Sequence, residues 1–281
     1  MPATHRYEDL TWSEVNEVVE ERRIPLLPVG TIEQHGPHLP LKIDRWTSTS
    51  VCDEAARRAP ERLLVMPPVA YGYTSHVMDF PGTITVHHET FIRYVVDVLK
   101  SLAYHGFKKI IVINGHGSNT QPLELASRRA MLETDAWVAM ANWWGLTTAD
   151  REFMATWRES EWPGGCSHAG EAETSIALHL DPTAVRMERA VDVVTDTNAQ
   201  KSKYHWTDLF GGAPLRMDGW TSTYSSDGTQ GSPTVATAAK GKALFEMAVN
   251  SLVEFSAEFS ARRFNARVDH HATAPTIPSP G

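Results

Sequence analysis

Residues 108–119, "KKIIVINGHGSN", carry the strongest signal for the fold of this chain. Four consecutive β-forming residues, 110–113, stand between two lysines and a glycine-rich turn. An unbroken apolar run of this kind is typical of a strand that is buried on both faces, as in a parallel sheet. Asn119 or Thr120 can cap a following helix, with Pro122 in its first turn. The segment therefore predicts a buried strand, a short polar turn and a helix.

The same order of strand and helix extends in both directions along the chain. Residues 24–30 and 136–144 predict two further apolar strands, and residues 62–73 predict a strand that breaks at a pair of prolines. Helical spacing and capping residues predict helices at residues 12–23, 47–59, 87–107, 167–182 and 236–264. Strands that alternate with helices and are apolar throughout predict an α/β fold, a single domain whose mostly parallel sheet is covered by helices on both faces.

The predicted domain spans residues 1–268. Residues 269–281 end in "ATAPTIPSPG" and are expected to form a disordered tail. Within the domain, residues 204–234 are aromatic and rich in glycine and serine, with no clear period.

Composition excludes several classes of function. The chain has 281 residues, a net charge of −8 and a pI near 5.9, which argue against a nucleic-acid or anionic-membrane partner. It lacks the 18 or so consecutive apolar residues of a membrane span, and residues 1–15 lack a signal-peptide pattern, so we expect a cytoplasmic protein. Cys52 and Cys166 are the only cysteines, so any metal must be held by nitrogen and oxygen ligands.

Polar side chains follow two of the predicted strands directly. "EQHGPH" (33–38) follows the first strand, and "NGHGSN" (114–119) follows the strand at 108–113. In an open parallel sheet, ligands bind just beyond the carboxyl ends of the strands. Glu33 and His35 are two residues apart, so in an extended backbone their side chains point the same way. The pattern fits half of a metal site, and it also fits a solvated turn.

Two further residues can reach the same edge of the sheet. Asp44 can return to it after the Gly36–Pro37 turn, and His116 lies between two glycines that permit close approach. Taken alone, Glu33 fits a surface carboxylate and Asp44 fits a turn or a helix N-cap. His38 and the pair His87–His88 are interpreted as structural or surface histidines.

A third polar segment, "HAGEAETS" (168–175), begins another predicted helix. His168 precedes the helix start, where backbone N–H groups favour an anion or a polarised oxygen. Glu171 and Glu173 lie in the first turn, where acidic residues also simply complement the helix dipole.

Four motifs together carry a family resemblance. "LPVGTIEQHGPHLPLKID" (27–44), "FPGT" (80–83), "NGHGSN" and "HAGEAETS" occur in this order. The set resembles the creatininase (creatinine amidohydrolase) family. The resemblance implies a creatininase-like α/β fold and two divalent metal ions, Zn²⁺ and/or Mn²⁺, with Fe²⁺ as a third candidate. It also implies hydrolysis of a C–N bond in a small-molecule amide, and a homo-oligomer, with a hexamer as one candidate assembly.

The resemblance also implies roles for individual residues. Glu33 and His116 would hold one metal and His35 the other, with Asp44 bridging both. Glu173 would be a further carboxylate ligand, and His168 would pass a proton to the leaving nitrogen.

The chain departs from creatininase at two positions. Ser118 stands where that enzyme has a glutamate ligand, and Gly164 stands where it has a substrate-stacking tryptophan. Trp144 falls where a second pocket tryptophan is expected, so Trp144, Ser118 and Glu171 are the candidate substrate-binding residues.

These departures make hydrolysis of another small amide, cyclic amide or formamide a better expectation than hydrolysis of creatinine itself. One alternative is a peptidase of the mycofactocin-maturation type. The other is a non-catalytic metal-binding homologue, which the serine at position 118 favours and the retained His168 disfavours.

Overall fold

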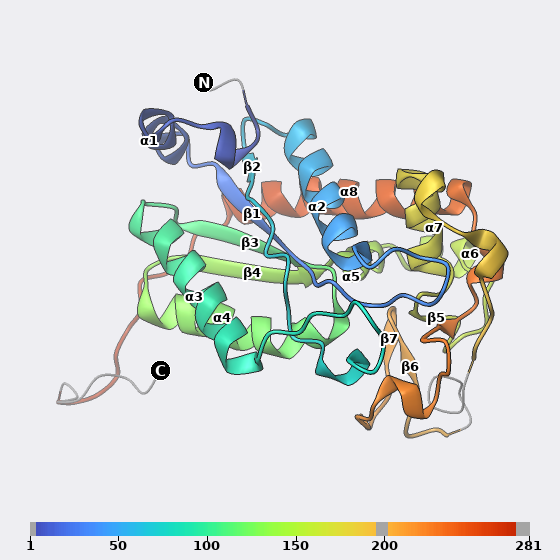
Figure 1. Cartoon of the computed structure of the whole chain (residues 1–281). Helices are drawn as coiled ribbons and strands as arrows, with labels where there is room; N and C mark the ends of the chain where they lie inside the picture. The colour runs from blue at the N-terminus through green and yellow to red at the C-terminus, as the bar shows by residue number, and fades with distance from the viewer. Residues whose placement is uncertain (1–3, 195–201, 274–281) are drawn as a thin grey trace.

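A four-stranded parallel sheet forms the centre of the molecule. The computed structural model describes residues 4–194 and 202–273 (Figure 1). The strands run in the order β2 (Leu63–Val65), β1 (Ile24–Val29), β3 (Lys109–Asn114) and β4 (Trp137–Asn142), and every neighbouring pair is parallel. The predicted α/β fold, a single domain with a mostly parallel sheet, is confirmed.

Helices cover both faces of this sheet, as Figure 1 shows. One face carries α1 (Trp12–Glu20), α3 (His88–Tyr104) and α4 (Thr120–Glu133), and the other carries α2 (Ile43–Arg58), α7 (Glu171–Leu180) and α8 (Ala238–Ala261). Successive strand residues point to opposite faces, so Ile110 and Val112 pack with α3 and α4 while Ile111 and Ile113 pack with α2 and α8. Because both sets are buried, the strand sequence is apolar throughout.

Several element boundaries differ from the sequence prediction. Helix α2 begins at Ile43, four residues early, which puts Asp44 in its first turn. Strand β4 ends at Asn142, because Trp143 starts a short helix, α5 (Trp143–Thr147). The helix predicted from residue 167 starts only at Glu171, after the short strand β5 (Cys166–His168) and Ala169, whose φ of +52° is not helical. The short helix α6 (Arg151–Trp157) was not predicted.

The long aromatic segment lies beyond the carboxyl ends of the sheet strands in Figure 1. It contains the two-residue strands β6 (Thr207–Asp208), β7 (Gly211–Gly212) and β8 (Gln230–Gly231), of which β8 pairs with β5. Residues 269–273 of the predicted tail adopt neither helix nor strand, and residues 274–281 lie outside the described residues.

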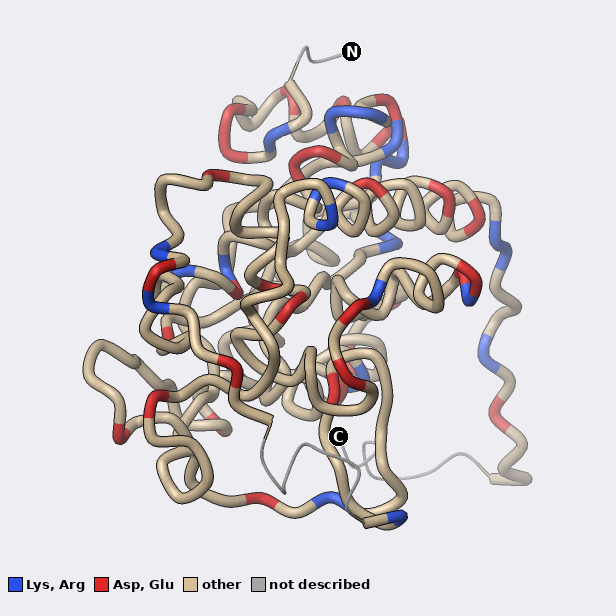
Figure 2. The backbone as a smooth tube through the Cα atoms, turned by 90° about the vertical axis from the view of Figure 1, so that its right-hand side faces the viewer, with Lys and Arg blue, Asp and Glu red and all other residues tan. Residues whose placement is uncertain are grey.

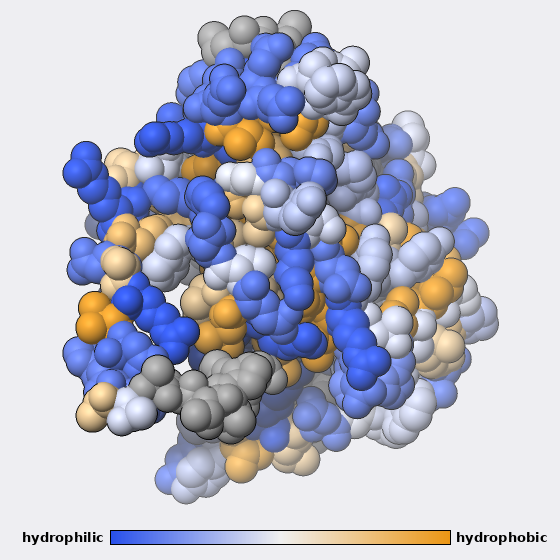
Figure 3. Space-filling view, turned by 90° about the vertical axis from the view of Figure 1, so that its left-hand side faces the viewer, coloured by the Kyte–Doolittle hydropathy of each residue, from blue (hydrophilic) through white to orange (hydrophobic). Residues whose placement is uncertain are grey.

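Charged residues of both signs are interspersed over the molecule (Figure 2). The face at the left of Figure 1 is largely hydrophilic, with hydrophobic residues in separate patches (Figure 3). Within the described ranges, none of the helices is long and apolar enough to cross a membrane. The expected lack of a nucleic-acid or membrane partner, the cytoplasmic location and the hexameric homo-oligomer stay predictions.

Candidate metal centre

Two glycines bring the start of helix α2 against the ends of two strands. Gly30 follows β1 and Gly115 follows β3. A Cβ added to Gly115 would collide with the carbonyl oxygen of Asp44, and one added to Gly30 would collide with the backbone of Arg45. Only glycine permits this approach. The carboxylate of Asp44 is thereby held at the carboxyl edge of the sheet.

Asp44 lies between two histidines at this edge. Its Oδ1 is 3.0 Å from His35 Nε2, and its Oδ2 is 3.1 Å from His116 Nδ1. Two groups of candidate ligands have their ligand atoms within 4.8 Å of one another: Glu33, Asp44 and His116 in the first, and His35, Asp44 and Glu173 in the second. All five side chains are buried. The structure thus brings together every residue that the sequence predicted as a metal ligand, with Asp44 common to both groups.

Two glutamates complete these groups from opposite sides. Glu33 Oε2 lies 3.4 Å from His116 Nδ1, and the same oxygen accepts a hydrogen bond from the hydroxyl of Thr74. Glu173 Oε1 lies 3.8 Å from His35 Nε2, and its Oε2 accepts a hydrogen bond of 2.5 Å from the N–H of Ala169. The backbone before α7 therefore orients Glu173 itself, where the sequence suggested a site for an external anion.

The histidine rings are held with one nitrogen facing the carboxylates. His35 Nδ1 is 3.2 Å from the carbonyl oxygen of Glu33, and His116 Nε2 is 3.1 Å from that of Tyr73. Because a carbonyl oxygen can only accept, these nitrogens carry the protons and donate. The other nitrogen of each ring faces the carboxylates at the centre, where it can give up its proton and bind a cation, which is the arrangement usual for metal-ligating histidines.

The buried carboxylates at the centre favour positive charge on the groups beside them, as the pKa values of His116 and His35 show. Burial disfavours the imidazolium form of His116, but the Glu33 and Asp44 carboxylates outweigh it and raise its pKa to about 10. Asp44 and Glu173 likewise raise the pKa of buried His35 well above its usual value. Burial alone would raise the pKa of Glu33, but the positive charge of His116 outweighs this effect and lowers the pKa. A bound cation can replace these protons as the neutralising charge.

Two buried atoms at the centre also lack a well-formed hydrogen bond, although each lies near an ionic neighbour. Among the described residues, no hydrogen bond of acceptable geometry reaches His35 Nε2 or Asp44 Oδ2. Buried polar atoms without a partner are uncommon, and both of these are good ligand atoms for a transition metal. The residues present therefore fit divalent cations such as Zn²⁺ or Mn²⁺.

His168 lies at the centre itself, next to the candidate metal ligands, as the family resemblance implied. Its ring centroid is 4.4 Å from that of His35, and its Nδ1 is 3.7 Å from Glu33 Oε1. Its Nε2 lies 2.9 Å from the carbonyl oxygen of Gln34 and 3.1 Å from the side-chain nitrogen of the same residue. Because the nearer partner, the carbonyl oxygen, can only accept, Nε2 donates to it and Nδ1 is left as the acceptor. Glu33, His35 and His168 form a third group within 4.8 Å, so Nδ1 is placed either to accept a proton or to bind a cation.

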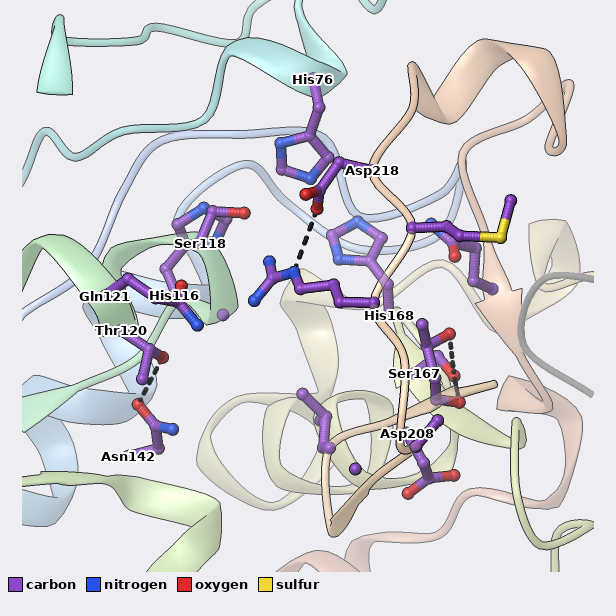
Figure 4. A pocket seen from close by; sticks show the side chains of 18 of the residues that line it. His76, His116, Ser118, Thr120, Gln121, Asn142, Ser167, His168, Asp208 and Asp218 are labelled. Atoms are coloured by element: carbon purple, nitrogen blue, oxygen red, sulfur yellow. Dashed lines mark hydrogen bonds and ion pairs between the residues drawn. The ribbon is translucent and has the colours of Figure 1, made fainter. Parts of the chain in front are cut away.

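A cavity of about 790 Å³ opens onto this centre (Figure 4). Ser118 and Trp144 line it, as predicted for substrate-binding residues. Part of the remaining wall comes from residues 205–219 of the aromatic segment. His76 and Asn142 are among the lining residues that sequence reasoning missed. Asn142 ends β4 and could have been found by the strand-end rule, whereas His76 lies in a short 3₁₀ turn (Ser75–Val77) and carried no signal.

The structure corrects the placement of Glu171, which the sequence put beside the substrate. Its carboxylate is fully buried and is not part of the cavity wall. One oxygen is 2.9 Å from Lys240 Nζ on α8, and the other accepts a hydrogen bond of 2.9 Å from the N–H of Ser160. These contacts tie α7 to α8 and to the chain after α6.

Adding Zn²⁺ or Mn²⁺ to chelator-treated protein should stabilise it. At 100 times the dissociation constant, a ligand specific for the folded state adds about 2.7 kcal/mol to the free energy of unfolding. For a domain of this size that corresponds to a rise in Tm of roughly 5 to 10 °C. Differential scanning calorimetry checks this, with KCl at equal ionic strength as the control. An unchanged Tm at saturating metal would contradict a metal centre.

Three curated relatives and a family model match most of the chain. The model, described as creatinine amidohydrolase, matches residues 8–256. The mycofactocin precursor peptide peptidase of Mycobacterium tuberculosis is 32% identical over 242 residues, covering 81% of this chain and 82% of that protein. The creatinine amidohydrolase of Pseudomonas putida is 29% identical over 258 residues, which cover 88% of this chain and 94% of that protein. The 3-dehydro-scyllo-inosose hydrolase of Thermotoga maritima is 27% identical over 249 residues, which cover 84% of this chain and 77% of that protein.

Solved structures of creatininase have the same fold. A variant of the Zn–Zn type superimposes with a TM-score of 0.78 at 28% identity, covering 92% of this chain and 99% of that one. A manganese form superimposes with a TM-score of 0.77 at 28% identity, and the match covers 92% of this chain and 100% of that one.

Proposed function

The chain belongs to the creatininase family, and from this membership we propose that it is a metal-dependent amidohydrolase. Its substrate would be a small amide, cyclic amide or formamide, whose C–N bond is hydrolysed. The observation that carries the proposal is the position of Asp44, whose two oxygens face two separate groups of buried ligands. A carboxylate shared in this way is the natural bridge of a dinuclear centre.

The ligand assignment follows from the two groups. Glu33 and His116 would hold one cation, His35 and Glu173 the other, and Asp44 both. When bound, two divalent cations would lower the pKa of a shared water towards about 7 and polarise the amide carbonyl. The Zn–Zn and manganese forms of the related structures support these metals for the present chain.

The protein's own residues would handle the proton and the substrate. His168 Nδ1 would accept the proton from the attacking water and return it to the leaving nitrogen. The hydrogen bond from its Nε2 to Gln34 keeps Nδ1 free for this task. Trp144 and Ser118 would contact the substrate, since both line the cavity.

A peptidase is the second candidate, and two observations favour it. The 32% identical relative is a peptidase that acts on a precursor peptide. The cavity of about 790 Å³ is also in the range that holds a drug-sized ligand, so it is large for a lactam of the size of creatinine. The end of a peptide would fit in this volume.

A substrate panel separates the candidates. Protein reconstituted with Zn²⁺ or Mn²⁺ would be assayed on formamides, lactams including creatinine, and peptides with a free carboxyl end, with the chelated protein as control. We expect turnover of a small amide that is lost on chelation. Cleavage of peptides alone would select the second candidate. A fully metal-loaded protein without turnover on any of them would indicate a non-catalytic homologue.

Ser118 is expected to make the two metal affinities unequal. It is half-buried in the turn Gly117–Asn119 beside His116, and a neutral hydroxyl is a poor substitute for a carboxylate ligand. A calorimetric titration of the metal-free protein should resolve two sites, and Ser118→Glu should narrow the gap between them. Ser118→Ala is the control, which should leave the gap unchanged. Two equally tight sites in the wild type would show that no ligand is missing.

A further inference from the structure

Asn142 lies on the cavity wall next to the metal centre and has no part in the ligand groups. It is the last residue of β4 and pairs in register with Asn114, the last residue of β3. Figure 4 shows its side chain on the same wall as Thr120, Gln121 and Ser118, with its oxygen bonded to Thr120. Its surroundings determine which end of the carboxamide faces the cavity.

The orientation follows from a backbone donor. The N–H of His116 donates to Asn114 at 3.1 Å, and a backbone N–H can only donate, so the accepting atom is Asn114 Oδ1. The other end of Asn114 is therefore its NH₂ group, which lies 2.8 Å from Asn142. The atom of Asn142 that receives this bond must be its oxygen, and the hydroxyl of Thr120 donates to the same oxygen at 3.1 Å. The NH₂ group of Asn142 is then at the opposite end.

This NH₂ group is available to a ligand. Across residues 4–194 and 202–273, no protein group accepts a hydrogen bond from Asn142 Nδ2, and the residue lines the cavity. Its position is also fixed relative to the metal centre, because Asn114 bonds both the N–H and the carbonyl oxygen of His116. The donor is thus pre-oriented, with its acceptor end already satisfied.

We propose that the Asn142 NH₂ group binds an oxygen of the substrate other than the oxygen of the scissile amide. The inference rests on the proposed amide hydrolysis and narrows its substrate class to amides that carry a second carbonyl or carboxylate oxygen close to the scissile bond. The scissile carbonyl would be bound at the candidate metal ligands. Asn142 lies one strand further along the sheet, about 4.8 Å from Asn114, so its NH₂ group would meet a different oxygen of the substrate. A pre-oriented donor selects for such an oxygen, since an analogue without it leaves the donor unpaired.

Two formamides with the same heavy-atom connectivity test the inference. N-(2-oxopropyl)formamide carries a second carbonyl oxygen, and N-isobutylformamide has a methyl group in its place. For the wild type with bound metal, kcat/KM for the first should exceed that for the second roughly tenfold, the effect of one neutral hydrogen bond. Calorimetric affinities for both compounds are measured in parallel, so that a failure of turnover does not hide the preference in binding.

Asn142→Asp is the decisive variant. It keeps the oxygen that Asn114 and Thr120 need but replaces the NH₂ group with a second acceptor, so the preference should fall to about one or invert. A purely structural role for Asn142 predicts an unchanged preference. Gln121→Ala is the control, because Gln121 is an exposed amide on the same wall outside this network, and it should keep the preference. Equal binding of both compounds by the wild type, or a preference that survives in Asn142→Asp, would overturn the inference. If neither compound is turned over but the binding preference is intact, the result contradicts the proposed amide hydrolysis and leaves the role of Asn142 standing.

Discussion

Replacing Asp44 with asparagine is expected to remove at least one metal ion per chain and to lower kcat by more than about 10⁴-fold, beyond the usual loss of a general acid–base group. Asp44 belongs to both proposed metal sites, and its charge offsets the repulsion between two cations. An amide of the same size keeps the packing but carries no charge. Elemental analysis of the purified variant, with kcat on the best substrate of the panel, measures both effects.

Asp53→Asn is the matched control for this substitution. Asp53 lies on the same helix, α2, and its carboxylate pairs with Arg6 at 2.9 Å instead of facing the metal centre. The control removes the same charge from the same helix and should keep both metal and activity. Thermal unfolding followed by circular dichroism shows whether each variant is folded. A folded Asp44→Asn protein with the wild-type metal content would contradict a bridging role.

The His168→Gln variant should lose about 10²- to 10⁴-fold in kcat, near 3 to 5 kcal/mol of barrier, and keep its metal. His168 Nδ1 faces the centre at 3.7 Å from Glu33, and its Nε2 is held by the carbonyl of Gln34. A glutamine side chain retains a donor of similar reach but cannot carry a proton from water to the leaving nitrogen. The measurement is kcat at saturating substrate together with the metal content of the same preparation.

His179→Gln is the control here, because His179 lies at the far end of α7 with its ring 5.4 Å from that of Phe245. It should retain full kcat. If His168→Gln loses metal in proportion to activity, His168 is a ligand through the group that it forms with Glu33 and His35. If it keeps full activity, the proton travels through a carboxylate at the centre.

The strands and their polar ends could be predicted from the sequence because both depend on local pattern. Apolar runs at residues 24–29 and 110–113 are buried on both faces, which leaves a parallel sheet between helices as the arrangement that satisfies them. In such a sheet the carboxyl ends of neighbouring strands meet at one edge. Glu33, His35 and His116 could therefore be expected together before any contact was known.

The role of α7 shows what local pattern leaves open. Glu171 and Glu173 both lie in its first turn, and at about 100° per residue their side chains point to nearly opposite sides of the helix. Periodicity predicts that they differ but not which of them faces the sheet edge. The packing of α7 on α8 decides this, since it turns Glu171 towards Lys240 and Glu173 towards His35.

The sequence by itself determined the α/β fold, the family and the strand-end histidines, because these follow from hydrophobic pattern and from motifs contiguous in the chain. Only the tertiary structure decided that Asp44 enters from the first turn of α2, that Glu171 turns away from the centre and that Asn114 and Thr120 bind the oxygen of Asn142. Each of these depends on how closely elements distant in sequence approach one another. Glycines, backbone hydrogen bonds and the rotation of each helix about its axis set that approach, and no local pattern encodes their combined result.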